Sequence, residues 1–185
     1  MAVYPKRFHT RRMGLPIYGA LAKAVIATSK EAGIQPIPIA DVGSSIGVFL
    51  SEIGKALKAD RGMLVGVDYG EAVSENYISE GSTLFPHNLQ SEEIPKIANG
   101  PFSVMTSWET AEHVHERYAD KIVRMFSENL APGGLLVFGA ATPGQRGKHH
   151  VNCRPPTYWH DKFRKVGVIR NDRLTGIYRK ELRLA

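Results

Sequence analysis

The fold expected for this chain is decided by the stretch Asp41-Val42-Gly43-Ser44-Ser45-Ile46-Gly47. The apolar run 37–42 predicts a short buried strand, and apolar residues at helical spacing then predict a helix over 46–58. Gly43 permits a tight turn, and Gly47 lets the helix approach the sheet or a ligand closely. The stretch therefore predicts a strand–turn–helix unit whose unpaired N–H groups, at the start of the helix, face a ligand.

A second acid ends the next expected strand. Residues 63–68 form another short apolar run, and Asp68 closes it, twenty-one residues after Gly47. At that position an acid can accept hydrogen bonds from both hydroxyls of a ribose. Asp41 ends the first strand, where a carboxylate suits a cationic ligand and disfavours a pyrophosphate. The two acids favour a nucleoside that carries an ammonium group.

Strands and helices alternate along the rest of the chain. Further strands are expected at 84–86, 102–107 and 135–141, further helices at 17–32, 115–130 and 156–166, and two short strands in the tail at 168–170 and 177–181. This alternation predicts an α/β fold, a single doubly wound Rossmann-like domain. We expect a mostly parallel sheet with helices on both faces and an abbreviated C-terminal end. Ligands on such sheets bind beyond the carboxyl ends of the strands.

The stretch 41–47 resembles the first motif of class I methyltransferases that depend on S-adenosylmethionine (SAM), which reads acid-x-Gly-x-Gly-x-Gly. Residues 65–68 resemble the second motif, whose acid holds the ribose. His87-Asn88-Leu89 resembles the third motif, which reaches the adenine. The segment 102–114 is similar to the fourth strand and its Glu-x-x-Glu-His extension, and 130–137 is similar to the helix end and fifth strand of the class.

The resemblance implies SAM as the cofactor and transfer of its methyl group to an O or N acceptor of unknown identity, giving S-adenosylhomocysteine. The implied cofactor-binding residues are Asp41, Gly43, Ser44, Ser45, Gly47, Asp68, Tyr69, Asn88, Leu89, Ser107 and Trp108. Ser45 departs from the family pattern because it replaces the middle glycine, where a Cβ crowds the cofactor or changes the turn. A catalytically silent SAM-fold binding module is therefore an alternative. A nicotinamide-dependent oxidoreductase is disfavoured by Asp41 and by an incomplete Gly-x-Gly-x-x-Gly pattern.

A set of Glu and His residues follows the fourth and fifth strands. The expected catalytic residues are Glu109, Glu112, His113 and His150. Three interpretations stay open: a neutral imidazole acts as the general base on the acceptor, the side chains bind a divalent metal, or they order the loops. The segment 142–152 resembles a methyltransferase subgroup with a Pro-Gly-Gln…His-Val-Asn loop, which favours His150 and Asn152 over His149 as lining of the site.

The metal interpretation has a resemblance of its own. The small-RNA 2′-O-methyltransferases use a Glu-x-x-Glu-His set with a later His, so a metal-assisted RNA methyltransferase is an alternative function. Charge agrees with an anionic partner: residues 1–12 carry four basic side chains and no acid, and 145–185 carry eleven against three acids. RNA, bound through these basic ends, is therefore one expected partner.

The bulk properties fit one domain of 185 residues. We expect residues 1–36 to form a basic lead and helix, and 37–185 to form the SAM-dependent methyltransferase domain. No apolar run reaches the roughly 20 residues of a membrane helix, and no signal peptide is recognised, so a cytoplasmic location without membrane partners is expected. Because little chain remains to close the acceptor site, a second subunit is another expected partner.

Overall fold

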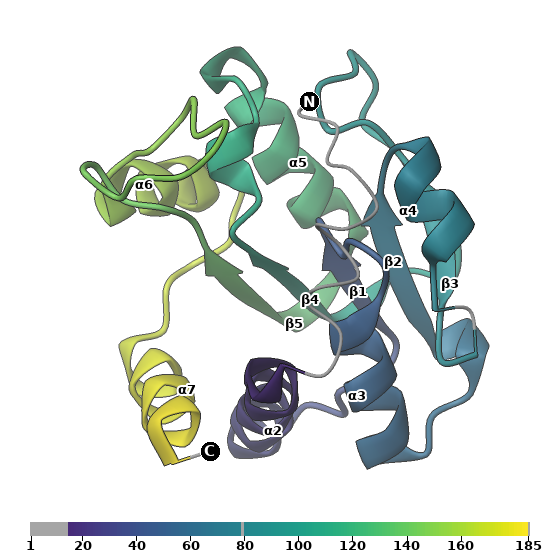
Figure 1. Ribbon diagram of the computed structural model, residues 1–185. Helices are drawn as coiled ribbons and strands as arrows, with labels where there is room; N and C mark the ends of the chain where they lie inside the picture. Colours follow the sequence, from purple (N-terminus) through teal and green to yellow (C-terminus); the bar gives the residue numbers. More distant parts are fainter. Residues whose placement is uncertain (1–14, 79, 185) are drawn as a thin grey trace.

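The computed structural model describes residues 15–78 and 80–184 (Figure 1). The four basic residues at 6–12 lie outside this part of the chain. The strands are β1 (Ile39–Val42), β2 (Leu64–Asp68), β3 (Thr83–Pro86), β4 (Phe102–Trp108) and β5 (Leu130–Gly139). The α-helices are α2 (Pro16–Glu31), α3 (Val48–Leu57), α4 (Glu71–Asn76), α5 (Ala119–Asn129), α6 (Pro156–Lys165) and α7 (Asp172–Leu184), and short 3-10 turns lie at Arg61–Met63, Ala111–His113 and Glu116–Tyr118.

The five strands form one parallel sheet in the order β3-β2-β1-β4-β5. Strand order reverses between β1 and β4, which places the topological switch point beside Asp41. Asp41 pairs in register with Gly66 of β2 and with Thr106 of β4. The expected doubly wound α/β domain with a mostly parallel sheet is confirmed.

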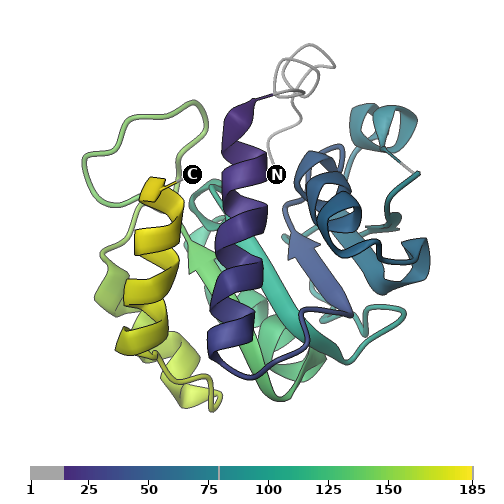
Figure 2. The same cartoon turned by 90° about the horizontal axis from the view of Figure 1, so that it is seen from below.

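Helices cover both faces of the sheet (Figures 1 and 2). Side chains alternate along each strand, so Ile39, Leu64 and Val104 pack with α2 and α3 on one face. Ala40, Val65 and Met105 pack with α5 and α6 on the other face. Helices α2 and α7 lie side by side on the α3 face (Figure 2).

The fifth strand is longer and less regular than expected. Helix α5 ends at Asn129, and β5 pairs with β4 at Leu130 and again from Leu135. The register shift takes up residues 131–134, and Gly133 (φ 75°) provides the left-handed residue that this bulge needs. The Pro-Gly-Gly run therefore belongs to an irregular strand start as well as to the helix end.

The tail corrects one expectation. The two short strands predicted at 168–170 and 177–181 are absent from the described residues, and 172–184 form helix α7. Asn171 begins the helix, because its Oδ1 accepts from the Leu174 N–H at 3.0 Å. Leu174 and Tyr178, one helical turn apart, then face the core. Helix α4, after β2, was not expected from the sequence.

Helix α2 shares a core with the sheet, because Ala22 and Val25 pack with Ile39 and Leu50. The boundary expected between residues 36 and 37 stays a prediction. Within 15–78 and 80–184, no helix combines the length and the apolar character needed to cross a bilayer.

Candidate active site

The turn after β1 contains three left-handed residues. Gly43 has φ 81°, Ser45 φ 52° and Gly47 φ 82°. Ser45 thus keeps the conformation that favours glycine, and this costs a non-glycine residue about 1 kcal/mol. The Gly43 N–H donates to the Val67 carbonyl at 2.8 Å, which ties the turn to β2.

Two side chains pack directly against the glycines. A Cβ on Gly43 would lie 2.0 Å from Thr110 Oγ1, and a Cβ on Gly47 would lie 2.9 Å from Tyr77 Cζ. Gly66 of β2 faces the same tyrosine, whose hydroxyl would lie 2.2 Å from an added Cβ. No other residue fits these positions without a shift of the neighbours, which explains the glycines in physical terms.

Asp68 is oriented by two backbone N–H groups. Ser45 donates to its Oδ2 at 2.7 Å, and Tyr69 donates to its Oδ1 at 2.7 Å. Burial nevertheless raises the pKa of Asp68 to about 6. The carboxylate therefore lies at the C-terminal edge of the sheet in a defined orientation, joined to the glycine turn.

Asp41 is buried, with 5% of its surface exposed. Thr106 Oγ1, on the neighbouring β4, donates to its Oδ1 at 2.7 Å. Burial raises the pKa of Asp41 to about 7, against the effect of this hydrogen bond. A cationic group beside Asp41 would restore the charged form of this carboxylate.

An unpredicted side chain from α7, Tyr178, lies within reach of the charge of Asp41. Burial, with a smaller contribution from the charge of Asp41, raises the pKa of Tyr178 to about 12. The Tyr178 hydroxyl and the Trp108 indole Nε1 are both buried beside each other, and their mutual contact partly offsets the effect of burial on Tyr178. Trp108 also packs edge-on against Phe49 at 4.6 Å between ring centroids. Tyr178 was missed because its segment was predicted to be a strand.

The other expected cofactor residues differ in exposure. Ser44 and Ser107 are buried at the strand ends, and Tyr69 is 51% exposed. Asn88 is half-buried and its Oδ1 accepts from the Gln90 N–H at 3.0 Å. Leu89 is 5% exposed and packs in the core on the α5 face.

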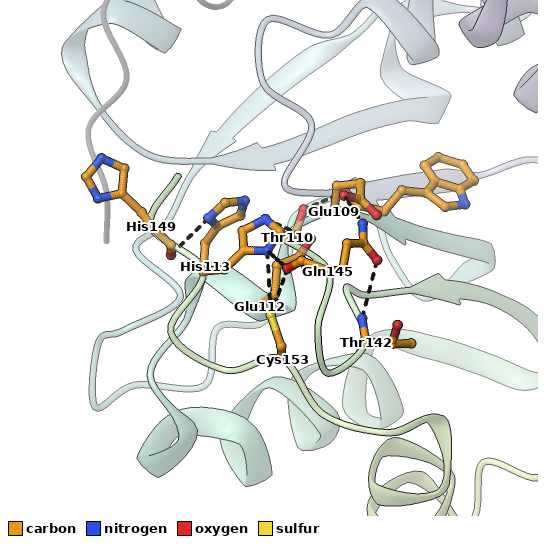
Figure 3. Close-up of polar contacts among 10 residues, drawn as sticks. Glu109, Thr110, Glu112, His113, Thr142, Gln145, His149 and Cys153 are labelled. Carbon is orange, nitrogen blue, oxygen red and sulfur yellow. Dashed lines mark hydrogen bonds and ion pairs between the residues drawn. The ribbon is translucent and has the colours of Figure 1, made fainter. Parts of the chain in front are cut away.

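The Glu and His residues gather between the loops after β4 and β5 (Figure 3). Donor atoms of Glu112, His113 and His150 lie within 4.8 Å of one another. His150 Nε2 is 4.0 Å from Glu112 Oε1, and the two imidazole rings meet edge-on at 4.8 Å between centroids. Burial raises the pKa of Glu112 to about 7. Three of the four expected catalytic residues thus come together.

Glu109 lies apart from this group. It is exposed and accepts a hydrogen bond from Gln145 Nε2 at 3.3 Å (Figure 3). His149 contributes its backbone, since its carbonyl contacts His113 Nδ1 at 3.2 Å. The two loops are joined where Val151 and Asn152 donate their N–H groups to the Glu112 carbonyl, at 2.8 and 3.0 Å. Gln145 is the Gln of the Pro-Gly-Gln…His-Val-Asn resemblance, but it was not among the expected catalytic residues.

The fold and the glycine turn agree with one class of protein, the methyltransferases. Residues 16–180 match the methyltransferase domain family, so the chain belongs to this family. The search of curated proteins gave no match.

Solved structures share the fold at low sequence identity. An O-methyltransferase family protein from Burkholderia thailandensis is 12% identical with a TM-score of 0.62, covering 86% of this chain and 53% of that one. Human N-acetylserotonin methyltransferase in complex with SAM is 12% identical with a TM-score of 0.54, covering 79% and 45%. A structure described as a pericyclic reaction enzyme is 14% identical with a TM-score of 0.51, covering 70% and 37%. The chain thus spans about half of the first two proteins and less of the third.

Proposed function

We propose that this chain binds SAM at the C-terminal edge of its sheet and transfers the methyl group to an O or N atom of an acceptor. The observation that carries the proposal is the pair Asp41 and Asp68, placed on either side of the glycine turn at the switch point. This arrangement suits a nucleoside with a positively charged side chain. Membership of the methyltransferase domain family supports the same reaction.

The residues present fit the cofactor. Asp68 would accept hydrogen bonds from the ribose hydroxyls, and Asp41 would face the ammonium group. Trp108 Nε1 and the Tyr178 hydroxyl, both buried beside each other, would donate to the carboxylate of the methionine part. The bound cofactor supplies a methyl group that its sulfonium charge has already activated for transfer.

The protein then has two tasks. The loops after β4 and β5 orient the acceptor for attack, and this orientation is the main source of rate in such a transfer. His113 and His150 promote loss of the acceptor proton, either as general bases or as ligands of a metal ion. Glu112 lies beside them, and its carboxylate, when ionised, attracts a protonated imidazole or a metal ion.

Methyl transfer is tested by the formation of S-adenosylhomocysteine. The purified chain is incubated with radiolabelled SAM and separate pools of RNA, small metabolites and protein. We expect labelled product in one pool with the wild type, a loss with Asp68→Asn, and no loss with Asp60→Asn, an exposed acid before the Arg61–Met63 turn. SAM binding without labelled product in any pool would favour the silent module.

The other expected partners remain predictions. RNA binding through the basic ends is supported by α7, where Arg179, Lys180 and Arg183 line one surface hollow. Its check is RNA affinity that falls steeply with salt in the wild type and less steeply in a triple Gln variant of these residues. A second subunit that completes the acceptor site, and a cytoplasmic location, also stay predictions.

A further inference from the structure

The Glu112 carboxylate is buried with little compensation among the described residues, where the backbone N–H groups of Glu112 and Ala141 only partly offset the cost of burial. None of its surface is exposed, and neither of its oxygens has a hydrogen-bond partner of good geometry there. A buried carboxylate needs a proton, a counter-charge or a metal ion. Its near neighbour His150 does not meet this need by hydrogen bonding, because 4.0 Å between Nε2 and Oε1 is too long for a hydrogen bond.

Both neighbouring imidazoles turn Nδ1 toward a backbone carbonyl. His113 Nδ1 contacts the His149 carbonyl at 3.2 Å, and His150 Nδ1 contacts the Gln145 carbonyl at 3.3 Å. A carbonyl oxygen only accepts hydrogen bonds, so each Nδ1 is placed to donate, and in a neutral imidazole the lone pair then lies on Nε2. An imidazole that donates one N–H to a carbonyl and offers the other nitrogen is the usual arrangement around a bound metal.

We propose that Glu112, His113 and His150 bind one divalent transition-metal ion of the Zn²⁺ type. One carboxylate oxygen and two imidazole nitrogens suit Zn²⁺, Mn²⁺ or Fe²⁺, whereas Mg²⁺ and Ca²⁺ prefer oxygen donors alone. The donor atoms lie within 4.8 Å of one another. Tetrahedral coordination at about 2.1 Å needs donors about 3.4 Å apart, so the side chains close in by roughly 1 Å when the ion binds.

The proposed ligand set is smaller than the sequence suggests. Glu109 accepts from Gln145 and is not one of the clustered residues. Cys153 Sγ lies 3.5 Å from His150 Nδ1, which is the ring nitrogen that faces the Gln145 carbonyl. Three protein ligands leave a coordination position open, as in catalytic rather than structural zinc sites. If the proposed function holds, the open position takes the acceptor oxygen, and the acceptor is a hydroxyl compound.

The test measures metal binding without SAM. The metal-free chain is titrated with Zn²⁺ by calorimetry and with Co²⁺ by its visible absorption, using the wild type, Glu112→Gln and His150→Gln. Two matched controls are His160→Gln on α6 and Glu128→Gln on α5, which lie outside the cluster. We expect one ion per chain, affinity at least about 100-fold weaker in the two cluster variants, and unchanged affinity in the controls. Excess Mg²⁺ should not displace Co²⁺.

Three results would overturn the proposal. They are no saturable Zn²⁺ or Co²⁺ binding by the wild type, equal affinity in the cluster variants, or displacement of Co²⁺ by Mg²⁺ at equal concentration. Circular dichroism checks that each variant is folded, and His150→Gln, at a half-buried position, is the safer of the two. A parallel titration with S-adenosylhomocysteine separates the proposals, because loss of the metal site leaves cofactor affinity unchanged and loss of cofactor binding leaves the metal site intact.

Discussion

The backbone N–H of Ser45 donates a 2.7 Å hydrogen bond to Oδ2 of Asp68, across 23 residues of chain. This bond joins the glycine turn after β1 to the end of β2. It fixes the carboxylate at the edge where the ribose of a nucleoside is expected, and it does so from the residue that replaces the middle glycine of the methyltransferase pattern. Ser45 adopts the glycine conformation (φ 52°), so the turn is preserved in spite of the substitution.

Asp68→Asn should weaken binding of S-adenosylhomocysteine. The amide loses the charge, and one of its two polar atoms is a donor that faces a backbone N–H. Hydrogen bonds to a charged group contribute about 1.5–3 kcal/mol, so we expect an affinity about 10- to 100-fold lower by calorimetry. Asp60→Asn is the matched control, and equal affinity of the two variants would contradict the role given to Asp68.

Gly43→Ala should destabilise the protein more than Gly144→Ala does. Both residues have positive φ, 81° and 89°, but an added Cβ meets Thr110 at Gly43 and nothing within 4 Å at Gly144. The backbone conformation alone costs about 1 kcal/mol, and overpacking adds about 1–3 kcal/mol. Denaturant unfolding gives both values, and equal losses would show that Thr110 moves away at little cost.

Tyr178→Phe should weaken cofactor binding. Loss of a hydrogen-bond donor to the cofactor lowers its affinity about 2- to 10-fold. Tyr158→Phe is the control, because the same hydroxyl is removed from a tyrosine of α6, on the opposite face of the sheet. If both variants keep full affinity, α7 takes no part in the cofactor site.

The stability of the free protein should depend on Asp41 in a defined direction of pH. The folded-state pKa of Asp41 is about 7, above the ordinary value of 3.8, so the folded chain holds a proton that the unfolded chain has lost. This contribution is complete below about pH 4 and is lost as the pH rises through 7. Asp41→Asn should therefore be more stable than the wild type at pH 8 and no more stable at pH 4.

Cofactor affinity should respond to the same group with the opposite trend. Because the ammonium group of the ligand favours the charged carboxylate, the wild type should bind S-adenosylhomocysteine more tightly at pH 8 than at pH 5. Thermal melting and calorimetry across this range provide both curves. If the affinity of the wild type did not change with pH, Asp41 would not interact with the ammonium group of the cofactor.

The sequence predicted the part of the site that lies within single strand–turn–helix units. Asp41, Gly43, Gly47 and Asp68 could be placed because a glycine turn and a strand-end acid are local features. Their position at the switch point follows from strand alternation, and the strand order agrees. Three of the four expected catalytic residues also lie together, because the ends of β4 and β5 are neighbours in a parallel sheet.

The contacts made across the fold could not be predicted in the same way. Two such contacts are Thr110 beside Gly43 and Tyr178 beside Trp108. They depend on side-chain directions and on helix packing, which the spacing of residues in the sequence does not determine. Helix α7 did have a signal, the Asn171 cap followed by Leu174 and Tyr178, but short apolar pairs there also fit strands. Glu109 belongs to the same Glu-x-x-Glu-His motif as Glu112, yet its left-handed backbone (φ 48°) turns its side chain toward Gln145.

The central claim is that the edge formed by Asp41, the glycine turn and Asp68 binds SAM. Calorimetric titration of the wild-type chain with SAM, S-adenosylhomocysteine and NADH tests it most directly. The account predicts saturable binding of one SAM per chain, competition by S-adenosylhomocysteine, and no heat from NADH. Binding of NADH alone, or no binding of SAM and S-adenosylhomocysteine, would contradict it.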